Sequence, residues 1–204
     1  MDFREHVETA WRTTMKFIGP VLILTLAQIV VSVVSFGFLA PVTMAGYMQS
    51  LLLALREGRE PEVKDLFSDM RLFFPLLLFG FLVMVALMIG FTMLVFPGII
   101  MTGCLVFGTI YMVPLMTDKD MGIFDALAES WAMATREPLA DQIILTLLYL
   151  VIISVGSSVV VAVIFAQPLA TLLVLSVYEE RLQNKQTLTA PPAAPSSPPP
   201  PPTA

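Results

Sequence analysis

Charged residues are scarce in this chain of 204 residues. They make up 13% of the sequence, against about 25% in an ordinary soluble domain, whereas hydrophobic residues make up 57%. Three long stretches contain no charged residue at all: 17–55, 72–117 and 142–178. These absences exclude a hidden soluble domain, because nearly every segment between the apolar stretches is short. The composition therefore predicts an all-α membrane protein.

Cysteine and histidine each occur only once. The lone Cys104 excludes an intramolecular disulfide and a cysteine-rich metal site. Because His6 is the only histidine and lies near the N-terminus, we expect neither a multi-histidine metal site nor a histidine-based catalytic triad. No predicted span contains an ionisable side chain of Asp, Glu, Lys, Arg or His, which counts against an ion-coupled pump.

Two further classes of site are disfavoured. The stretch from Asp118 to Glu129 has oxygen side chains at three positions of an EF-hand-like loop, but Ile123 stands where the sharp turn needs glycine. We therefore interpret this match as chance and predict no metal and no cofactor. Acidic residues outnumber basic ones, with a net charge of -5, so no nucleic-acid partner is predicted either.

Each uncharged stretch is too long for a single helix across a bilayer. At about 1.5 Å per residue, roughly 40 residues would reach about 60 Å, twice the ~30 Å hydrocarbon core. Proline and glycine are poor at continuing a helix, and they mark predicted turns at Pro41, at Pro97 with Gly98, and at Pro168. The sequence therefore predicts about six transmembrane helices, arranged as three helical hairpins.

The prolines also indicate an internal repeat. Pro20 and Pro41 bracket the first predicted span, and Pro75 and Pro97 bracket the third at nearly the same spacing. Proline suits the first turn of a helix, where its missing N–H group would have no partner anyway, so Pro20 and Pro75 are interpreted as span starts. The first two hairpins are therefore predicted to form a pseudo-repeat.

The third unit is less regular. Pro138 is interpreted as its span start, but Pro168 lies farther from it than the spacing in the other units, which predicts an insertion or a longer helix. Residues 168–178 are short for a full span. The small residues at 156–158 are therefore an alternative position for the third turn.

A short amphipathic segment precedes each unit. Apolar side chains three and four residues apart give each segment one apolar face, so we predict three helices that lie in the membrane interface. Both tryptophans of the chain occur in these segments near an arginine, a pattern typical of a membrane surface. The predicted interfacial anchors are Trp11, Arg12, Phe67, Arg71, Trp131 and Arg136.

The basic residues predict the orientation. With the three turns on one side of the membrane, all 11 Lys and Arg residues fall on the other side. Because basic loops are retained in the cytoplasm, we predict a multi-pass protein of the bacterial cytoplasmic (inner) membrane with both termini cytoplasmic. Residues 1–183 are predicted to form the integral membrane domain, and residues 184–204, which are rich in proline, a disordered cytoplasmic tail.

Several short motifs carry a family resemblance. They are Arg56-x-Gly58-x-x-Pro61-x-x-x-Asp65-Leu66-Phe67, Phe96-Pro97-Gly98-Ile99-Ile100, Phe124-Asp125-Ala126-Leu127-x-x-Ser130, and Tyr178. Together they resemble the recurrent pattern of bacterial six-span membrane proteins of unassigned function, which include relatives of the membrane domain of glycerophosphoryl diester phosphodiesterases. The resemblance covers about residues 11–181 and implies a six-span fold. The carboxylate and histidine site of the soluble phosphodiesterase domain has no counterpart here, so no hydrolase activity is implied.

The favoured function is non-enzymatic. We predict an inner-membrane scaffold or accessory factor with a polar surface facing the cytoplasm, because the sequence offers no catalytic group within its spans. The alternative is a permease, channel or lipid-handling protein for a neutral or amphipathic solute, since repeated units commonly build transporters. The expected partners are the lipid bilayer, a protein bound through the cytoplasmic loops or tail, and a second copy of the chain.

Overall fold

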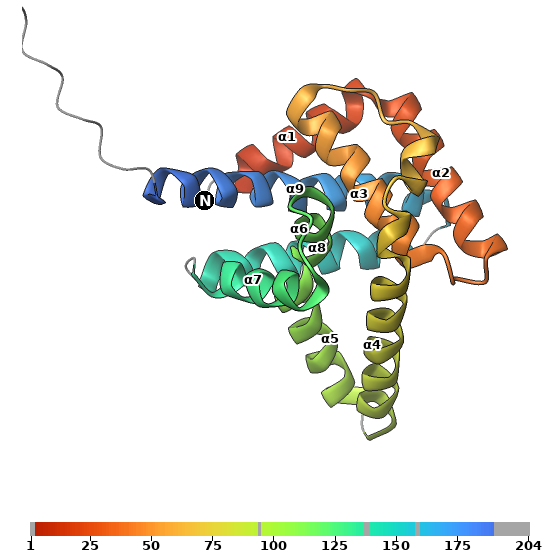
Figure 1. The fold of residues 1–204 in the computed structure, drawn as a ribbon, viewed down its shortest axis with the longest axis vertical. Coiled ribbons are helices and arrows are strands. Elements are labelled where there is room, and N and C mark those ends of the chain that lie inside the picture. The colour runs from red at the N-terminus through yellow and green to blue at the C-terminus, as the bar shows by residue number, and fades with distance from the viewer. Residues whose placement is uncertain (1–2, 94, 137–138, 158–159, 190–204) are drawn as a thin grey trace, which may run out of the picture.

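All regular structure in the described part of the chain is helical (Figure 1). The structure is a computed structural model that describes residues 3–93, 95–136, 139–157 and 160–189. The α-helices are α1 (Phe3–Lys16), α2 (Ile18–Val34), α3 (Ala40–Glu57), α4 (Phe73–Met93), α5 (Val95–Thr109), α6 (Met112–Asp118), α7 (Ile123–Arg136), α8 (Leu139–Ser157) and α9 (Val160–Thr189). Two short 3-10 helices, η1 (Val63–Phe67) and η2 (Met70–Leu72), precede α4. The predicted all-α class is confirmed.

The structure contains two to four candidate membrane spans among the described residues. Val63–Thr92 and Gly98–Asp118 are each long and apolar enough to cross a membrane. Arg4–Lys16 with Ile18–Val34, bent by 90°, and Ile123–Arg136 with Leu139–Ser154, bent by 114°, meet the same criteria as pairs. These helices indicate a multi-pass membrane protein in contact with a lipid bilayer.

The helices pair along the chain as α2 with α3, α4 with α5, and α8 with α9. In the first unit, α3 begins 22 residues after α2. The starts of α5, α8 and α9 adjoin residues outside the described part, so the insertion or longer helix expected in the third unit stays a prediction.

Prolines stand where helices begin in the first two units. Pro20 and Pro75 lie in the first turns of α2 and α4, Pro41 lies in the first turn of α3, and Pro97 in that of α5. A proline in a first turn loses no intrahelical hydrogen bond, which explains these positions. Pro138 lies outside the described residues.

Pro168 does not mark the third turn, and that expectation is corrected. It is buried inside α9, which is described from Val160. The alternative turn position at 156–158 overlaps residues 158–159, which lie outside the described part. An interior proline is tolerated in a membrane helix because neighbouring groups can satisfy the freed carbonyl. The apolar part of α9, residues 160–178, is about 28 Å long and matches the ~30 Å hydrocarbon core.

The amphipathic segments differ from the prediction in one unit. α1 and α7 are α-helices, as expected, and each meets the following helix at a sharp bend. The second segment is instead the pair η1 and η2. The Asp65 side chain accepts a hydrogen bond from the backbone N–H of Glu62 at 3.2 Å. Such a local bond competes with regular α-helix and favours a tight turn.

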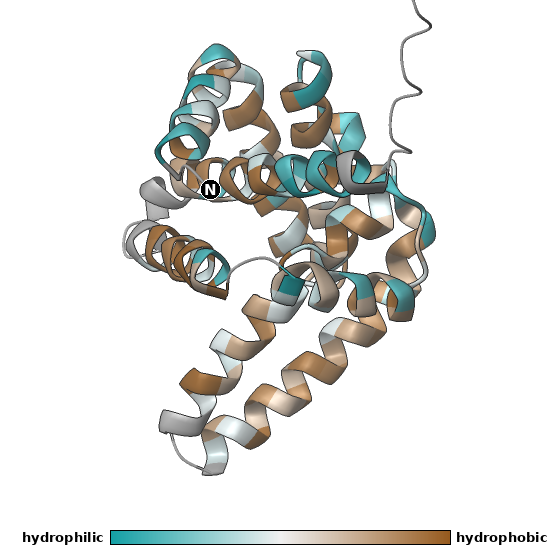
Figure 2. Ribbon diagram, turned by 90° about the vertical axis from the view of Figure 1, so that its left-hand side faces the viewer, coloured by the Kyte–Doolittle hydropathy of each residue, from teal (hydrophilic) through white to brown (hydrophobic). Residues whose placement is uncertain are grey.

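The C-terminal helix extends past the predicted domain boundary. α9 continues to Thr189, so residues 184–189 are helical and do not belong to an irregular tail. The rest of the predicted tail, residues 190–204, lies outside the described part. Figure 2 shows hydrophilic residues concentrated in α1 and in the C-terminal half of α9, which pack together. The polar and apolar parts of the fold are therefore separated in space.

The three hairpins diverge and do not form one parallel bundle. In Figure 1, α4 and α5 run side by side away from the other helices, and α9 runs across the direction of α4. The buried core lies where the hairpins meet and includes Leu24, Tyr47, Leu115 and Leu172. In contrast, α4 exposes large apolar side chains along its length, among them Phe74, Phe81 and Met88. Figure 2 shows the hydropathy of this helix by colour. A bilayer would cover this surface.

Candidate functional site

The ends of α3 and α6 meet the interior of α9 at a charged cluster. Arg56 near the end of α3 donates two hydrogen bonds to the carboxylate of Asp118, the last residue of α6, one of them at 3.0 Å from Nη2 to Oδ2. Its Nε donates to Oε1 of Glu179, on α9, at 2.6 Å. We call Arg56, Asp118 and Glu179 the Arg56 cluster. Through it, one arginine joins all three units.

The Arg56 cluster is largely shielded from solvent. The side chains of Arg56, Asp118 and Glu179 are 28%, 7% and 19% exposed. Burial alone would lower the pKa of Arg56, but its hydrogen bonds with the two carboxylates raise that pKa above the usual value. Lys119 lies 3.3 Å from Asp118 and balances the second negative charge. A fork-shaped arginine is suited to such a site because it can bind two carboxylates at once.

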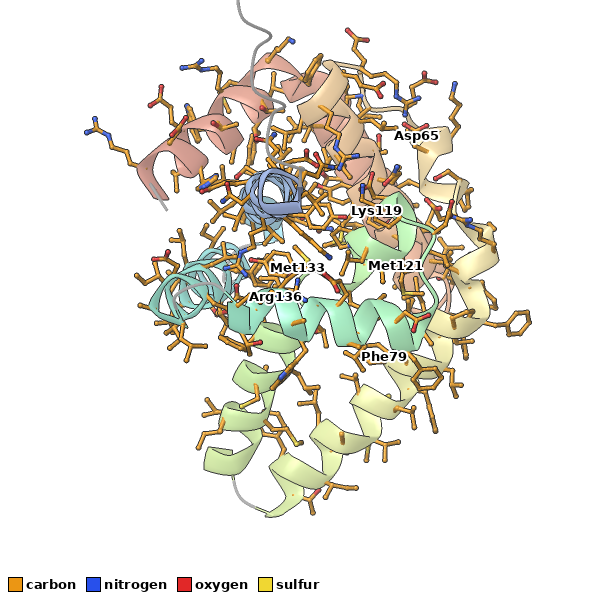
Figure 3. The ribbon with its side chains drawn as sticks, turned by 60° about the vertical axis from the view of Figure 1, so that its left-hand side comes forward. Asp65, Phe79, Lys119, Met121, Met133 and Arg136 are labelled. Carbon is orange, nitrogen blue, oxygen red and sulfur yellow. The ribbon has the colours of Figure 1, made fainter. Side chains whose placement is uncertain are left out.

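Arg181, two residues after Glu179 in the chain, is a buried cation. It is 4% exposed, its guanidinium lies 5.0 Å from the ring centre of Tyr111, and it donates a hydrogen bond from Nη1 to the carbonyl of Met133. Its Nε and Nη2 have no hydrogen-bond partner among the described residues. Figure 3 labels Met133 towards the end of α7. A cation there stabilises the terminal carbonyls, so Arg181 fastens α9 to α7.

Tyr111 links two further helices. Its ring stacks on that of Tyr178 with centres 6.3 Å apart, and its hydroxyl donates to Oε1 of Gln142 at 3.0 Å. Nε2 of Gln142 then donates to the carbonyl of Phe107 at 3.1 Å. Gln142 was expected only as the first residue of an uncharged stretch. The structure shows that it ties α8 to α5.

The motif that runs from Arg56 to Phe67 forms a compact connection that follows α3 in the chain. Gly58 adopts a left-handed conformation, with φ of 67°, and ends the helix. Asp65, labelled in Figure 3, accepts hydrogen bonds from Ser50 at 2.8 Å and from Arg59. Gly46 allows this approach, because a Cβ there would lie 2.3 Å from the carbonyl oxygen of Asp65. The motif therefore has a structural role in this chain.

His6 makes contacts that the sequence did not suggest. Its Nε2 lies 2.5 Å from Oε2 of Glu180, and its Nδ1 lies 3.1 Å from Oγ of Ser176. Ser176 and Glu180 are four residues apart on α9, a spacing that places both on one face of the helix. The order of a carboxylate, an imidazole and a hydroxyl is that of a catalytic triad. The expectation that His6 forms no catalytic triad therefore depends on the surroundings of Ser176.

The surroundings of Ser176 do not suit nucleophilic catalysis. Its hydroxyl also donates to the carbonyl of Leu173 at 2.9 Å, and it lies in the interior of α9, where helical hydrogen bonds occupy the backbone N–H groups. An oxyanion needs free donors beside the nucleophile. We therefore interpret His6, Ser176 and Glu180 as a contact that holds α1 against α9.

Replacing His6 with Ala should loosen α1. The loss of two partly buried hydrogen bonds should cost about 1–2 kcal/mol and speed tryptic cleavage after Lys16 about 5–30-fold, provided cleavage requires local opening. The measurement is the cleavage rate of the purified protein in detergent. Glu8→Ala is the control, because Glu8 contacts only Arg12 in an exposed pair. Equal cleavage rates for the two variants would contradict the role of His6.

The predicted interfacial anchors lie at the surface but do not form one cluster. Trp11 and Trp131 are each about half exposed, and Phe67 is 40% exposed. The three arginines form salt bridges: Arg12 with Glu8 at 2.9 Å, Arg71 with Asp69 at 3.6 Å and with Asp120, and Arg136 with Glu129 at 3.8 Å. Their location is compatible with a membrane surface, which stays a prediction.

Small residues within the second hairpin allow close packing. A Cβ at Gly98 would lie 2.6 Å from the ring of Phe91, and one at Gly108 would lie 2.5 Å from the ring of Trp131. Gly103 differs, because a Cβ there would meet nothing within 4 Å. In the described residues, no group of three or more His, Cys, Asp or Glu side chains could hold a metal ion.

Comparisons with known proteins do not indicate a function for this chain. The resemblance to bacterial six-span proteins stays a prediction. The helical hairpins and the Arg56 cluster therefore carry the functional argument. No model of a known protein family, no curated protein and no solved structure matches this chain.

Proposed function

We propose that this chain is a non-enzymatic protein of the bacterial cytoplasmic membrane that acts as a scaffold or accessory factor. Six apolar helices would cross the bilayer as three hairpins, with α1, η1 with η2, and α7 at the cytoplasmic surface. The observation that carries the proposal is the Arg56 cluster, which joins the ends of α3 and α6 to the interior of α9. A fixed polar face of this kind offers a surface to a protein partner.

The distribution of polar contacts supports this orientation. The salt bridges of Arg59, Lys64 and Arg71 belong to the connection between α3 and α4, on the same side as the Arg56 cluster. The hairpin turns at the opposite ends of the helices lack charged residues. By the rule that basic loops stay in the cytoplasm, the Arg56 cluster is cytoplasmic.

The hydroxyl groups within the apolar helices favour a scaffold over a transporter. Six of them donate a hydrogen bond to the carbonyl four residues earlier: Thr25, Ser32, Thr43, Thr102, Thr109 and Thr146. A hydroxyl used in this way offers no free donor to a polar solute. Gln28 and Gln49 have buried Oε1 atoms without a partner among the described residues, but both belong to the first hairpin. They do not extend a polar path across the three units.

Cysteine labelling tests the proposed topology. In a variant with Cys104 replaced by Ala, single cysteines would replace Gly37, Ser68 and Asn184, all of which are exposed. We expect a membrane-impermeant thiol reagent added to intact cells to label only position 37, because the other two positions are cytoplasmic. Permeabilised cells are the control and should show labelling at all three positions.

Other labelling patterns would contradict the topology in specific ways. Labelling of Asn184→Cys in intact cells would show that α8 and α9 cross the membrane an odd number of times. Labelling of Ser68→Cys would show the same for α2 and α3. An unlabelled Gly37→Cys in intact cells would mean that the first hairpin does not reach the far side.

The scaffold role has a separate test. Crosslinking in native membranes, followed by mass spectrometry, would compare the wild type with the charge reversal Lys64→Glu, which alters an exposed side chain on the cytoplasmic face. We expect a protein that is recovered with the wild type and depleted with the variant. Recovery of the same proteins in equal amounts with both would count against docking at this face.

A further inference from the structure

We propose that two apolar grooves beside Trp131 bind one lipid with two acyl chains, one chain in each groove. This inference goes beyond the scaffold role and requires only that the protein lies in a membrane. The grooves occur where α7 crosses over α5, in the space that the diverging second and third hairpins leave open.

The first groove lies between α5 and α8 and has a volume of about 390 Å³. Gly103, Cys104 and Phe107 line it from α5, and Ile143 and Leu147 line it from α8. Phe107 follows Gly103 and Cys104 by four and three residues, and Leu147 follows Ile143 by four, so a single face of each helix forms a wall. The groove therefore follows the helices into the apolar layer.

The second groove lies between α5 and the apolar face of α7 and has a volume of about 540 Å³. Phe124, Leu127 and Trp131 line it from α7, and Leu105 and Gly108 line it from α5. Phe124 is 83% exposed, so one side of this groove opens towards the surroundings. For an interfacial helix, that side faces the hydrocarbon layer.

Neither groove offers a free hydroxyl donor from its threonine. Thr146 in the first groove donates to the carbonyl of Gln142 at 2.8 Å, and Thr109 in the second donates to that of Leu105 at 2.7 Å. A hydrocarbon chain suits such walls because it brings no polar group that would need a partner. Both volumes also fall within the range of about 300–1,000 Å³ that is typical of ligand pockets.

Trp131 forms a fixed wall between the grooves. Trp131 and Cys104 line both grooves, so the two share a border. The indole ring packs against Gly108 and meets the ring of Phe107 edge to face, with centres 6.3 Å apart. Because the ring is held from two sides, the grooves stay separate. Two adjacent apolar grooves that share one wall suit a lipid whose two acyl chains are attached to one glycerol backbone.

The lining of the grooves predicts weak selectivity for the lipid headgroup. None of the described residues that line either groove is charged. The acyl chains should therefore dominate binding, and the expected ligand is a diacyl phospholipid with either a zwitterionic or an anionic headgroup.

The decisive experiment fills one groove and leaves the protein fold unchanged. Gly103→Leu places a side chain in the first groove, where a Cβ meets nothing within 4 Å. Gly19→Leu is the matched control, because its Cβ also meets nothing within 4 Å and it lies in α2, outside both grooves. Native mass spectrometry of the full chain released from detergent would measure the fraction that carries one added diacyl phosphatidylcholine.

We expect the wild type and Gly19→Leu to retain one lipid, and Gly103→Leu to bind it at least about tenfold more weakly. Equal retention by all three proteins, or no retained lipid in the wild type, would overturn the proposal and indicate ordinary exchanging bilayer lipid. Melting temperatures of the two variants would show whether Gly103→Leu is folded.

Cys104 gives a second measurement that needs no variant. It is exposed and lines both grooves, so a bound lipid should shield its thiol. We expect diacyl phosphatidylcholine to slow alkylation of Cys104 in delipidated protein about tenfold, at a concentration of about ten times its dissociation constant. A lipid with one chain should protect less, because one groove stays open. Equal protection by both lipids would overturn the two-chain arrangement, and no protection would overturn binding at this place.

Discussion

Replacing Arg56 with Gln should lower the free energy of unfolding by about 2–4 kcal/mol, because Asp118 and Glu179 would remain shielded without their shared cation. The expected loss is below the roughly 3–5 kcal/mol of a fully buried ion pair, since Arg56 is 28% exposed. The measurement is equilibrium unfolding in mixed detergent micelles, followed by circular dichroism. The three units should also separate more readily, because the arginine joins them.

Two further variants make this result specific. Arg12→Gln removes an exposed pair with Glu8 and should cost less than about 0.5 kcal/mol. Arg56→Lys keeps the charge but loses the forked geometry, so its effect should fall between the two. If Arg56→Gln destabilised the protein no more than Arg12→Gln does, the Arg56 cluster would not be what holds the units together.

Replacing Gly46 with Ala should destabilise the protein by about 1–3 kcal/mol, although alanine is the better helix former. The added Cβ would lie 2.3 Å from the carbonyl oxygen of Asp65 and 2.6 Å from that of Leu66. Both are backbone atoms, so the contact cannot be relieved by a change of rotamer. The connection formed by η1 would have to move away from α3. Unfolding in mixed micelles again measures the effect.

Gly103→Ala is the matched control for Gly46→Ala, and its effect should have the opposite sign. Gly103 is also in a helix, but a Cβ there would meet nothing within 4 Å. The gain in helix propensity should therefore appear alone, as about 0.5–1 kcal/mol of stabilisation. Destabilisation of similar size in both variants would show that close approach to η1 is not what requires Gly46.

The helix starts of the first two units could be predicted from the sequence because their signals are local. Proline at Pro20, Pro41, Pro75 and Pro97 marks helix starts through its missing N–H group, and the uncharged stretches fix how much chain must be folded. The turn predicted at Pro168 was wrong, because an apolar helix can continue through a proline where neighbouring groups satisfy the freed carbonyl.

The sites could not be predicted because they depend on contacts between distant parts of the chain. Arg56 and Glu179 are 123 residues apart, and His6 and Glu180 are 174 apart. From the sequence, Arg56 and Asp118 were only charges in cytoplasmic loops. His6 was dismissed because it was the only histidine, yet one histidine can join a hydroxyl and a carboxylate that a partner helix supplies four residues apart.

The two grooves could not be predicted from the sequence for a different reason. The apolar face of α7, with Phe124, Leu127 and Trp131, was predicted to face the bilayer, and its position is compatible with that. The sequence did not show that α5 would pass beneath Trp131. Gly108 was a usable signal, because a position without a side chain in an apolar helix allows an aromatic ring to approach.

The length of α9 has a mechanical consequence. Beyond its apolar residues, which end at Tyr178, α9 continues as a helical segment of residues 179–189 that is about 16 Å long. The contacts of His6 with Ser176 and Glu180 hold this segment against α1. A molecule that attaches to the far end of α9 would therefore be held at a fixed distance from the rest of the fold.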